Sequence, residues 1–222
     1  MTETMTYNPI IKICGIKTSE MLEVVIDAGA DIVGFMNFPK SPRHVDIDQI
    51  GELISQARGR IETAVVTVNP DNSRISEIAM FDPHWLQLHG TEKVSRVTSI
   101  RNEGGVPVIK VLPVGAAEDV AVIAEYERIA DRILLDAKPP MNASRPGGLG
   151  VPFDWDLLNA LDPELPFMLS GGLNPENVSE AVTKLQPFGL DVSSGVESAP
   201  GEKDENKIRA FISNARATAA KI

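Results

Sequence analysis

Short apolar runs rich in β-branched residues recur along the whole chain, separated by polar and turn-forming segments. Within each run the apolar residues are nearly continuous rather than alternating, which is typical of strands buried on both faces of a parallel sheet. The pattern predicts eight strands, at residues 10–15, 31–36, 62–68, 84–90, 107–114, 132–138, 166–172 and 189–196.

Segments with helical spacing lie between these runs, with apolar residues three and four positions apart. Asp46 is expected to cap one of these helices, and Asn174 another, with Pro175 in the first helical position. Helices are predicted most clearly at residues 19–29, 46–59, 174–185 and about 204–220.

Regular alternation of strands and helices without a break in composition indicates a single domain over residues 1–222, with residues 1–8 as a flexible N-terminus. Eight repeats of this unit predict a (β/α)₈ barrel of the TIM type. A doubly wound open sheet is the alternative, but the segment after the first strand, CGIKTS, lacks the G-x-G-x-x-G pattern common in that fold.

The chain is acidic, with a formal net charge of −10 and a pI of about 4.8. This charge argues against binding to nucleic acid or to an anionic membrane. A single cysteine excludes an intrachain disulfide framework and a cysteine-rich zinc site. The N-terminal residues lack a signal-peptide pattern and no apolar stretch reaches membrane-spanning length, so a cytoplasmic protein is expected.

Two glycine- and serine-containing segments, SGGL and DVSSGVE, end the seventh and eighth predicted strands. In barrels of this type, the loops after these strands commonly bind a phosphate through backbone N–H groups. Ordinary turn chemistry is the alternative for either segment alone. The candidate residues are Gly171, Gly172, Ser193 and Ser194, together with Asp191, whose carboxylate is expected to face backbone amides or a sugar hydroxyl rather than phosphate.

Cys14 and Asp136 follow the first and sixth apolar runs, so both are expected at the barrel face that carries active sites. Burial among apolar neighbours would favour a protonated Asp136 that can donate a proton. Cys14 would need a lowered pKa to act as a base, and an inert core cysteine is an equal alternative. Lys12 is expected to point away from Cys14, whereas Lys17 in the following loop could assist it.

Arg43, in the loop NFPKSPRHV after the second strand, could hold a carboxylate or be a solvated surface residue. His89 ends the fourth strand and could contact a ligand or be a satisfied core group. It shares no metal-ligand spacing with the other histidines, and no phosphate-loop or dinucleotide motif is present, so neither metal nor cofactor is expected. Residues 139–152, rich in proline and glycine, are expected to form a mobile lid.

These segments together resemble the phosphoribosylanthranilate isomerase family of tryptophan biosynthesis. The similarity rests on KICGIK, GFMNFPKSPRHV, LQLHG, LLDAK, GGLG, SGGLNPENV and DVSSGVESAPGEKD, which run in the family's order from about residue 10 to 210.

The resemblance implies an Amadori rearrangement of N-(5′-phosphoribosyl)anthranilate, with Asp136 as general acid and Cys14 as general base. It further implies that Arg43 holds the anthranilate carboxylate and that the glycine and serine loops hold the phosphate. The partner is then a phosphorylated small molecule, bound by a monomer or homodimer. A histidine-pathway isomerase, indole-glycerol-phosphate synthase and a phosphate-binding protein without catalysis are the rival interpretations. The first would carry aspartate in place of Cys14, and the second would need a catalytic lysine–glutamate set that the sequence does not show.

Overall fold

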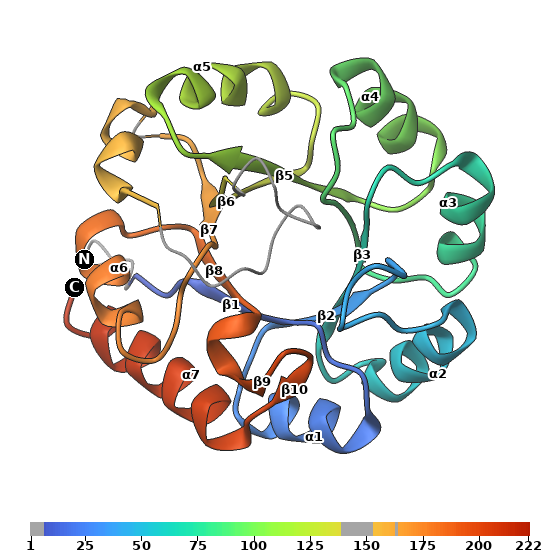
Figure 1. Cartoon of the computed structure of the whole chain (residues 1–222), viewed down its shortest axis with the longest axis horizontal. Coiled ribbons are helices and arrows are strands. Elements are labelled where there is room, and N and C mark those ends of the chain that lie inside the picture. Colours follow the sequence, from blue (N-terminus) through green and yellow to red (C-terminus); the bar gives the residue numbers. More distant parts are fainter. Residues whose placement is uncertain (1–6, 139–152, 163) are drawn as a thin grey trace, which may run out of the picture.

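A computed structural model describes residues 7–138, 153–162 and 164–222. Its eight parallel strands pair in sequence order and close into a barrel, because β8 pairs with β1. Figure 1 looks down this barrel, with the strands in a central ring and the helices outside them. The strands are β1 Ile10–Cys14, β2 Ile32–Met36, β3 Glu62–Thr67, β4 Trp85–Leu88, β5 Val108–Val114, β6 Arg132–Ala137, β7 Phe167–Leu169 and β8 Gly189–Val192. The predicted barrel is thereby confirmed.

Helices connect successive strands and cover the outside of the barrel (Figure 1). Between β6 and β7 the described residues contain only a short 3₁₀ helix, so the expected eightfold alternation is incomplete there. The predicted lid, residues 139–152, lies outside the described residues. The helices are α1 Ser19–Asp27, α2 Ile47–Ala57, α3 Asn72–Ala79, α4 Val94–Glu103, α5 Ala117–Tyr126, η1 Trp155–Ala160, α6 Val178–Leu185, η2 Ser194–Val196 and α7 Glu205–Ala219.

The helix ends follow the sequence signals except at α6. Asp46 occupies the N-cap position of α2 as predicted, but its side chain makes no capping hydrogen bond. The Asp204 side chain caps α7 by accepting from the Lys207 N–H at 3.0 Å. Asn174 does not start α6 directly. Its Oδ1 accepts from the Asn177 N–H at 2.9 Å, which forms a turn first, and the α-helix begins only at Val178.

Two apolar layers explain why the strand residues are continuously apolar. The larger layer lies between strands and helices, and the smaller one fills the barrel with side chains from β5, β6 and β7: Ile109, Val111, Leu134 and Met168. Because strand residues alternate between the two layers, both sets of positions must be apolar. The exceptions are a few buried polar strand residues, among them Lys12, Lys110, Asp136 and Asp191.

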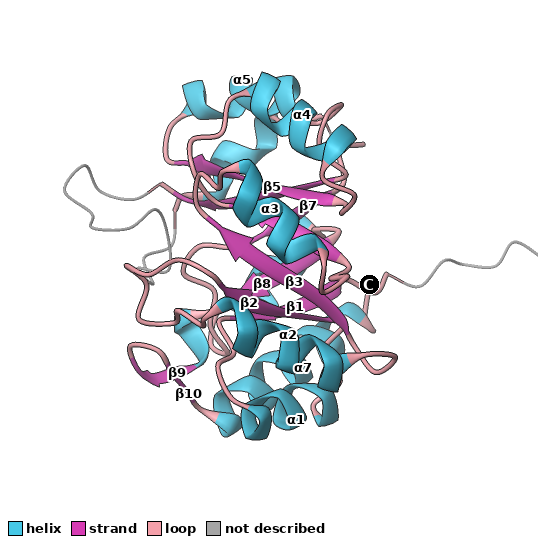
Figure 2. Ribbon diagram, turned by 90° about the vertical axis from the view of Figure 1, so that its right-hand side faces the viewer, coloured by secondary structure: helices cyan, strands magenta, loops and turns pink. Residues whose placement is uncertain are grey.

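The segment after β8 departs from the prediction of a strand reaching residue 196. The strand ends at Val192, η2 follows, and β9 (Glu197–Ala199) and β10 (Glu202–Lys203) form an antiparallel hairpin. Figure 2 shows this hairpin at the end of the barrel toward which the strands point. It therefore stands beside the mouth where active sites of this fold are found.

At the N-terminus, residues 1–6 of the segment expected to be flexible lie outside the described residues. Tyr7 donates from its hydroxyl to the Pro187 carbonyl at 2.8 Å, and Arg216 of α7 donates to Asn8 Oδ1 at 2.6 Å. Within the described ranges, no helix is long and apolar enough to cross a membrane.

Candidate active site

Cys14 ends β1 on the inner face of the barrel, and the sequence-based expectation about its neighbours is wrong. Lys12 was expected to point away from Cys14, but residues two apart on a strand share a face. Lys12 is fully buried beside the thiol, within hydrogen-bonding reach of it. Lys17, the expected helper, instead lies at the Pro42 carbonyl, 3.5 Å from its oxygen.

The environment of Cys14 acts on its thiol in two opposing ways. Burial raises the pKa of Cys14, and the neighbouring Lys12 ammonium opposes that rise without cancelling it. The raised pKa makes the thiolate, once formed, a stronger base than an exposed cysteine. The lowered thiol pKa that Cys14 would need as a base is therefore not found, although Lys12 supplies a positive charge beside it.

Asp136 lies at the carboxyl end of β6 and also points into the barrel. Its Oδ2 is 3.1 Å from His89 Nε2, and its Oδ1 accepts from the Ala137 N–H at 2.9 Å. Since His89 follows β4 and β5 lies between the two strands, this contact is made across the inner face. The structure thus brings His89 and Asp136 together, and His89 orients the carboxyl group.

Asp191 of β8 has a different partner from the one expected. Its Oδ1 accepts from Lys12 Nζ at 2.7 Å, and Ser170 Oγ lies 3.4 Å from its Oδ2. Lys12 and Asp191 are directly paired in register on neighbouring strands, so their inward side chains meet. The carboxylate balances a buried ammonium rather than facing backbone amides.

The glycine loops after β7 and β8 lie against each other at the mouth. A Cβ on Gly195 would overlap the Leu173 carbonyl, so only glycine allows this approach. Gly171 and Gly172 both have positive φ, 82° and 70°, and among the described residues neither N–H has an acceptor. These two donors are free for an anion, as a phosphate site requires.

Ser193 and Ser194 differ in what they offer. The Ser193 hydroxyl donates to the Cys14 carbonyl at 3.0 Å, which ties the loop after β8 to the end of β1. The Ser193 hydroxyl proton is therefore already donated to a backbone carbonyl and is not available to a ligand. Ser194 begins η2, and its side chain has no hydrogen bond with another described residue.

Arg43 is neither a solvated surface residue nor an isolated donor. Its Nε and Nη2 donate to the two carboxylate oxygens of Glu197 at 2.6 and 2.8 Å, and Arg43 is 3% exposed. Lys203 adds a further contact to Glu197 at 2.8 Å. The remaining guanidinium nitrogen, Nη1, has no partner in the described part of the chain, so Arg43 retains a donor for a ligand.

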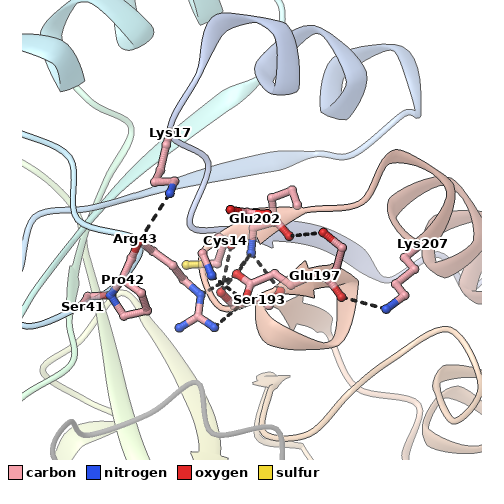
Figure 3. A network of polar contacts seen from close by, with 12 residues as sticks. Cys14, Lys17, Ser41, Pro42, Arg43, Ser193, Glu197, Glu202 and Lys207 are labelled. Carbon is pink, nitrogen blue, oxygen red and sulfur yellow. Dashed lines mark hydrogen bonds and ion pairs between the residues drawn. The ribbon is translucent and has the colours of Figure 1, made fainter.

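Glu197 and Lys203 were not identified from the sequence as functional residues. Both lie on the β9–β10 hairpin, in segments that carried the family resemblance but received no role. Their charge and position next to DVSS gave the only signal, because their partner Arg43 is 154 residues away from Glu197 in the sequence. Figure 3 shows Arg43 and Lys207 approaching Glu197 from opposite sides, with Cys14 and Ser193 close by.

No group of three or more histidine, cysteine, aspartate or glutamate side chains suited to a metal ion occurs within residues 7–138, 153–162 and 164–222. The chemistry that the described residues support directly is proton transfer, since a thiol and a carboxyl group occupy one barrel mouth. Fold and side chains together define a (β/α)₈-barrel enzyme of acid–base chemistry.

Comparisons with known proteins narrow this class to one family. Residues 11–214 match the family model of N-(5′-phosphoribosyl)anthranilate (PRA) isomerase. A relative from Rhodopseudomonas palustris named N-(5′-phosphoribosyl)anthranilate isomerase is 49% identical over 209 residues, which is 94% of this chain and 98% of the relative. The chain therefore belongs to the N-(5′-phosphoribosyl)anthranilate isomerase family.

Solved structures agree with this assignment. A structure of monomers generated from the dimeric phosphoribosylanthranilate isomerase of Thermotoga maritima matches with a TM-score of 0.80 and 33% identity, covering 95% of this chain and all of that one. Another, of the isomerase bound to reduced 1-(o-carboxyphenylamino)-1-deoxyribulose 5-phosphate, matches with a TM-score of 0.82, 33% identity and the same coverage. The predicted family and isomerase function in tryptophan biosynthesis are confirmed.

Proposed function

We propose that Asp136 and Cys14 are the general acid and general base that convert N-(5′-phosphoribosyl)anthranilate to 1-(2-carboxyphenylamino)-1-deoxyribulose 5-phosphate. The observation that carries the proposal is that both side chains point into the same barrel mouth, from β6 and β1. Two proton-transfer groups on separate strands can act on different atoms of one bound sugar. The resemblance to the family supports the same two residues.

The reaction needs one proton delivered and another removed. Asp136 protonates the ribose ring oxygen, and the ring opens as the nitrogen lone pair forms an iminium. The positive iminium acidifies the proton on C2, which the Cys14 thiolate removes to give an enolamine. Protonation at C1 and loss of the C2 hydroxyl proton then give the ketone, so the overall change is an isomerisation with no added reactant.

The two anionic ends of the substrate, a phosphate and a carboxylate, are matched by two different groups of hydrogen-bond donors. The N–H groups of Gly171 and Gly172, with Ser194 beside them, are suited to the phosphate. Arg43, held rigid by Glu197, offers Nη1 to the anthranilate carboxylate. In this proposal His89, Asp191 and Ser193 act by holding Asp136, Lys12 and the end of β1 rather than by direct substrate contact.

Turnover of freshly generated phosphoribosylanthranilate, followed by loss of anthranilate fluorescence, tests the roles. We expect Cys14→Ser and Asp136→Asn each to lose on the order of a hundredfold or more of wild-type activity. Asp131→Asn is a matched control, because Asp131 precedes β6 at the opposite end of that strand and contacts Arg101 rather than the mouth.

Full activity of Cys14→Ser would overturn the role of Cys14 as base and would mean that Cys14 is a structural core residue. A wild-type protein that binds the reduced product but turns over no substrate would instead be a binding protein. Activity on an aminoimidazole carboxamide ribotide in place of phosphoribosylanthranilate would favour the histidine-pathway reaction.

A cytoplasmic location and a monomeric or homodimeric state complete the proposal. A catalytic thiol must stay reduced, which a cytoplasmic environment provides. The relation to a dimeric isomerase supports the homodimer as one of the two states. Light scattering of the purified protein distinguishes monomer from dimer.

A further inference from the structure

Lys12 is a buried charged residue that the proposed acid–base steps do not use. It is fully buried on the inner face of β1, where it is the direct register partner of Asp191 on β8. Removing an ammonium from water is unfavourable, and the pair with Asp191 compensates for this only when the geometry is good. Packing alone therefore does not explain a lysine in the barrel interior, two positions before Cys14 on the same face of β1.

Glycine at position 34 creates the space in which the ammonium and the thiol meet. Gly34 of β2 is the register partner of Cys14. A Cβ at this position would lie 2.9 Å from Cys14 Sγ and 3.1 Å from Lys12 Nζ, so both atoms border the same gap. The ammonium is thus shared between the Asp191 carboxylate and the Cys14 sulfur.

The charged groups around Cys14 favour a negative charge on its sulfur. Lys12 comes from β1, Asp191 from β8, and Lys203 from β10, while β2 contributes only Gly34. Arg43 and Glu197 complete the cluster through their contacts with each other and with Lys203. With three cationic and two anionic side chains, the cluster is neutral only when Cys14 is a thiolate.

Lys12 and Lys203 are both able to supply this charge near neutral pH. Burial disfavours the ammonium of Lys12, but Asp191 and Cys14 outweigh it and the pKa of Lys12 is raised. Burial lowers the pKa of Lys203 to about 8. Lys12 is therefore the more constant of the two cations as the pH increases.

We propose that Lys12 is a positioning residue: its ammonium, held in place by Asp191, stabilises the thiolate of Cys14 and so supplies the active form of the base. This inference rests on the proposed role of Cys14. It adds a function for Lys12, and it assigns Asp191 the task of aiming and partly neutralising that ammonium. Lys12 itself does not touch the reacting carbon.

Titration of the thiol in the ligand-free protein tests the inference without any turnover. The chain contains one cysteine, so thiolate absorbance in the ultraviolet reports on Cys14 alone. We expect Lys12→Met to move the titration midpoint to higher pH, because the counter-charge is lost. Asp191→Asn should move the midpoint to lower pH, because the carboxylate that repels the thiolate and partly neutralises the Lys12 ammonium is removed.

Opposite shifts are the decisive outcome, since a purely structural role would not produce them. Lys40→Met, which removes an exposed lysine from the loop after β2, should leave the midpoint unchanged. Shifts in the same direction, or no shift, would overturn the proposal. If Lys12→Met does not fold, Lys12→Gln, which keeps a polar side chain without the charge, takes its place in the titration and should also move the midpoint to higher pH.

Turnover provides the second readout. Near pH 7, Lys12→Met should lose on the order of tenfold or more in kcat, with KM little changed, and raised pH should restore part of the loss. A wild-type protein without isomerase activity would refute the proposed function while leaving the titration interpretable. The two failures are therefore distinguishable.

Discussion

Replacing Glu197 with glutamine removes the carboxylate shared by Arg43 and Lys203 while nearly preserving the size of the side chain. Glu197 is 8% exposed and also accepts from the Gly201 N–H at 3.1 Å. Burial raises the pKa of Glu197, but the hydrogen bonds and charges of Arg43 and Lys203 outweigh this and lower it from 4.5 to about 2. The lowered pKa links the network to the stability of the fold.

The contribution of Glu197 to the free energy of unfolding follows from the difference between its pKa in the folded and unfolded states. A carboxyl group with a lowered folded pKa stabilises the fold above its unfolded pKa, and the stabilisation is lost as pH falls through the folded pKa. A fall from 4.5 to about 2 corresponds to about 3 kcal/mol near pH 7. Near pH 3.5 the unfolded chain already binds the proton, which reduces the contribution by roughly 1.4 kcal/mol.

Urea unfolding of the wild type and of Glu197→Gln at the two pH values measures this contribution. We expect the variant to be about 3 kcal/mol less stable near pH 7, and the difference to shrink by roughly 1.4 kcal/mol near pH 3.5. Glu202→Gln, at an exposed site on the same hairpin, should change stability by no more than about 0.5 kcal/mol. A difference of equal size at both pH values would refute the reasoning.

Two further substitutions test packing around buried charges. Gly34→Ala places a methyl group 2.9 Å from Cys14 Sγ and 3.1 Å from Lys12 Nζ, so we expect a loss of roughly 1–3 kcal/mol in urea unfolding together with reduced turnover; wild-type values for both would contradict the close packing. Glu92→Gln leaves Lys110, 2.8 Å away and buried, without its counter-charge, and should cost about 3–5 kcal/mol. Unchanged stability of this variant would show that the ion pair contributes little.

The barrel could be predicted because its strands carry a local signal. A strand between two apolar layers is apolar at every position, and runs such as residues 62–68 and 107–114 show this without reference to distant residues. The start of α6 was misplaced because Asn174 caps a preceding turn, and turn and helix caps use the same side chain.

The sequence identified most of the site residues, but it did not predict which of them contact one another. Cys14 and Asp136 could be identified because each directly follows an apolar run. The position of Lys12 followed from strand periodicity and was still misjudged, since positions two apart share a face. The pairing of Arg43 with Glu197 depends on how the barrel brings distant loops together, and no local pattern encodes it.

The C2-deuterium isotope effect on turnover tests the central claim, that Asp136 opens the ring and Cys14 removes the C2 proton. In Cys14→Ser, C2–H cleavage should limit the rate, so the isotope effect should exceed that of the wild type. In Asp136→Asn, ring opening should limit the rate, and the effect should approach one. An isotope effect suppressed by Cys14→Ser and enlarged by Asp136→Asn would contradict the assignment of the two roles.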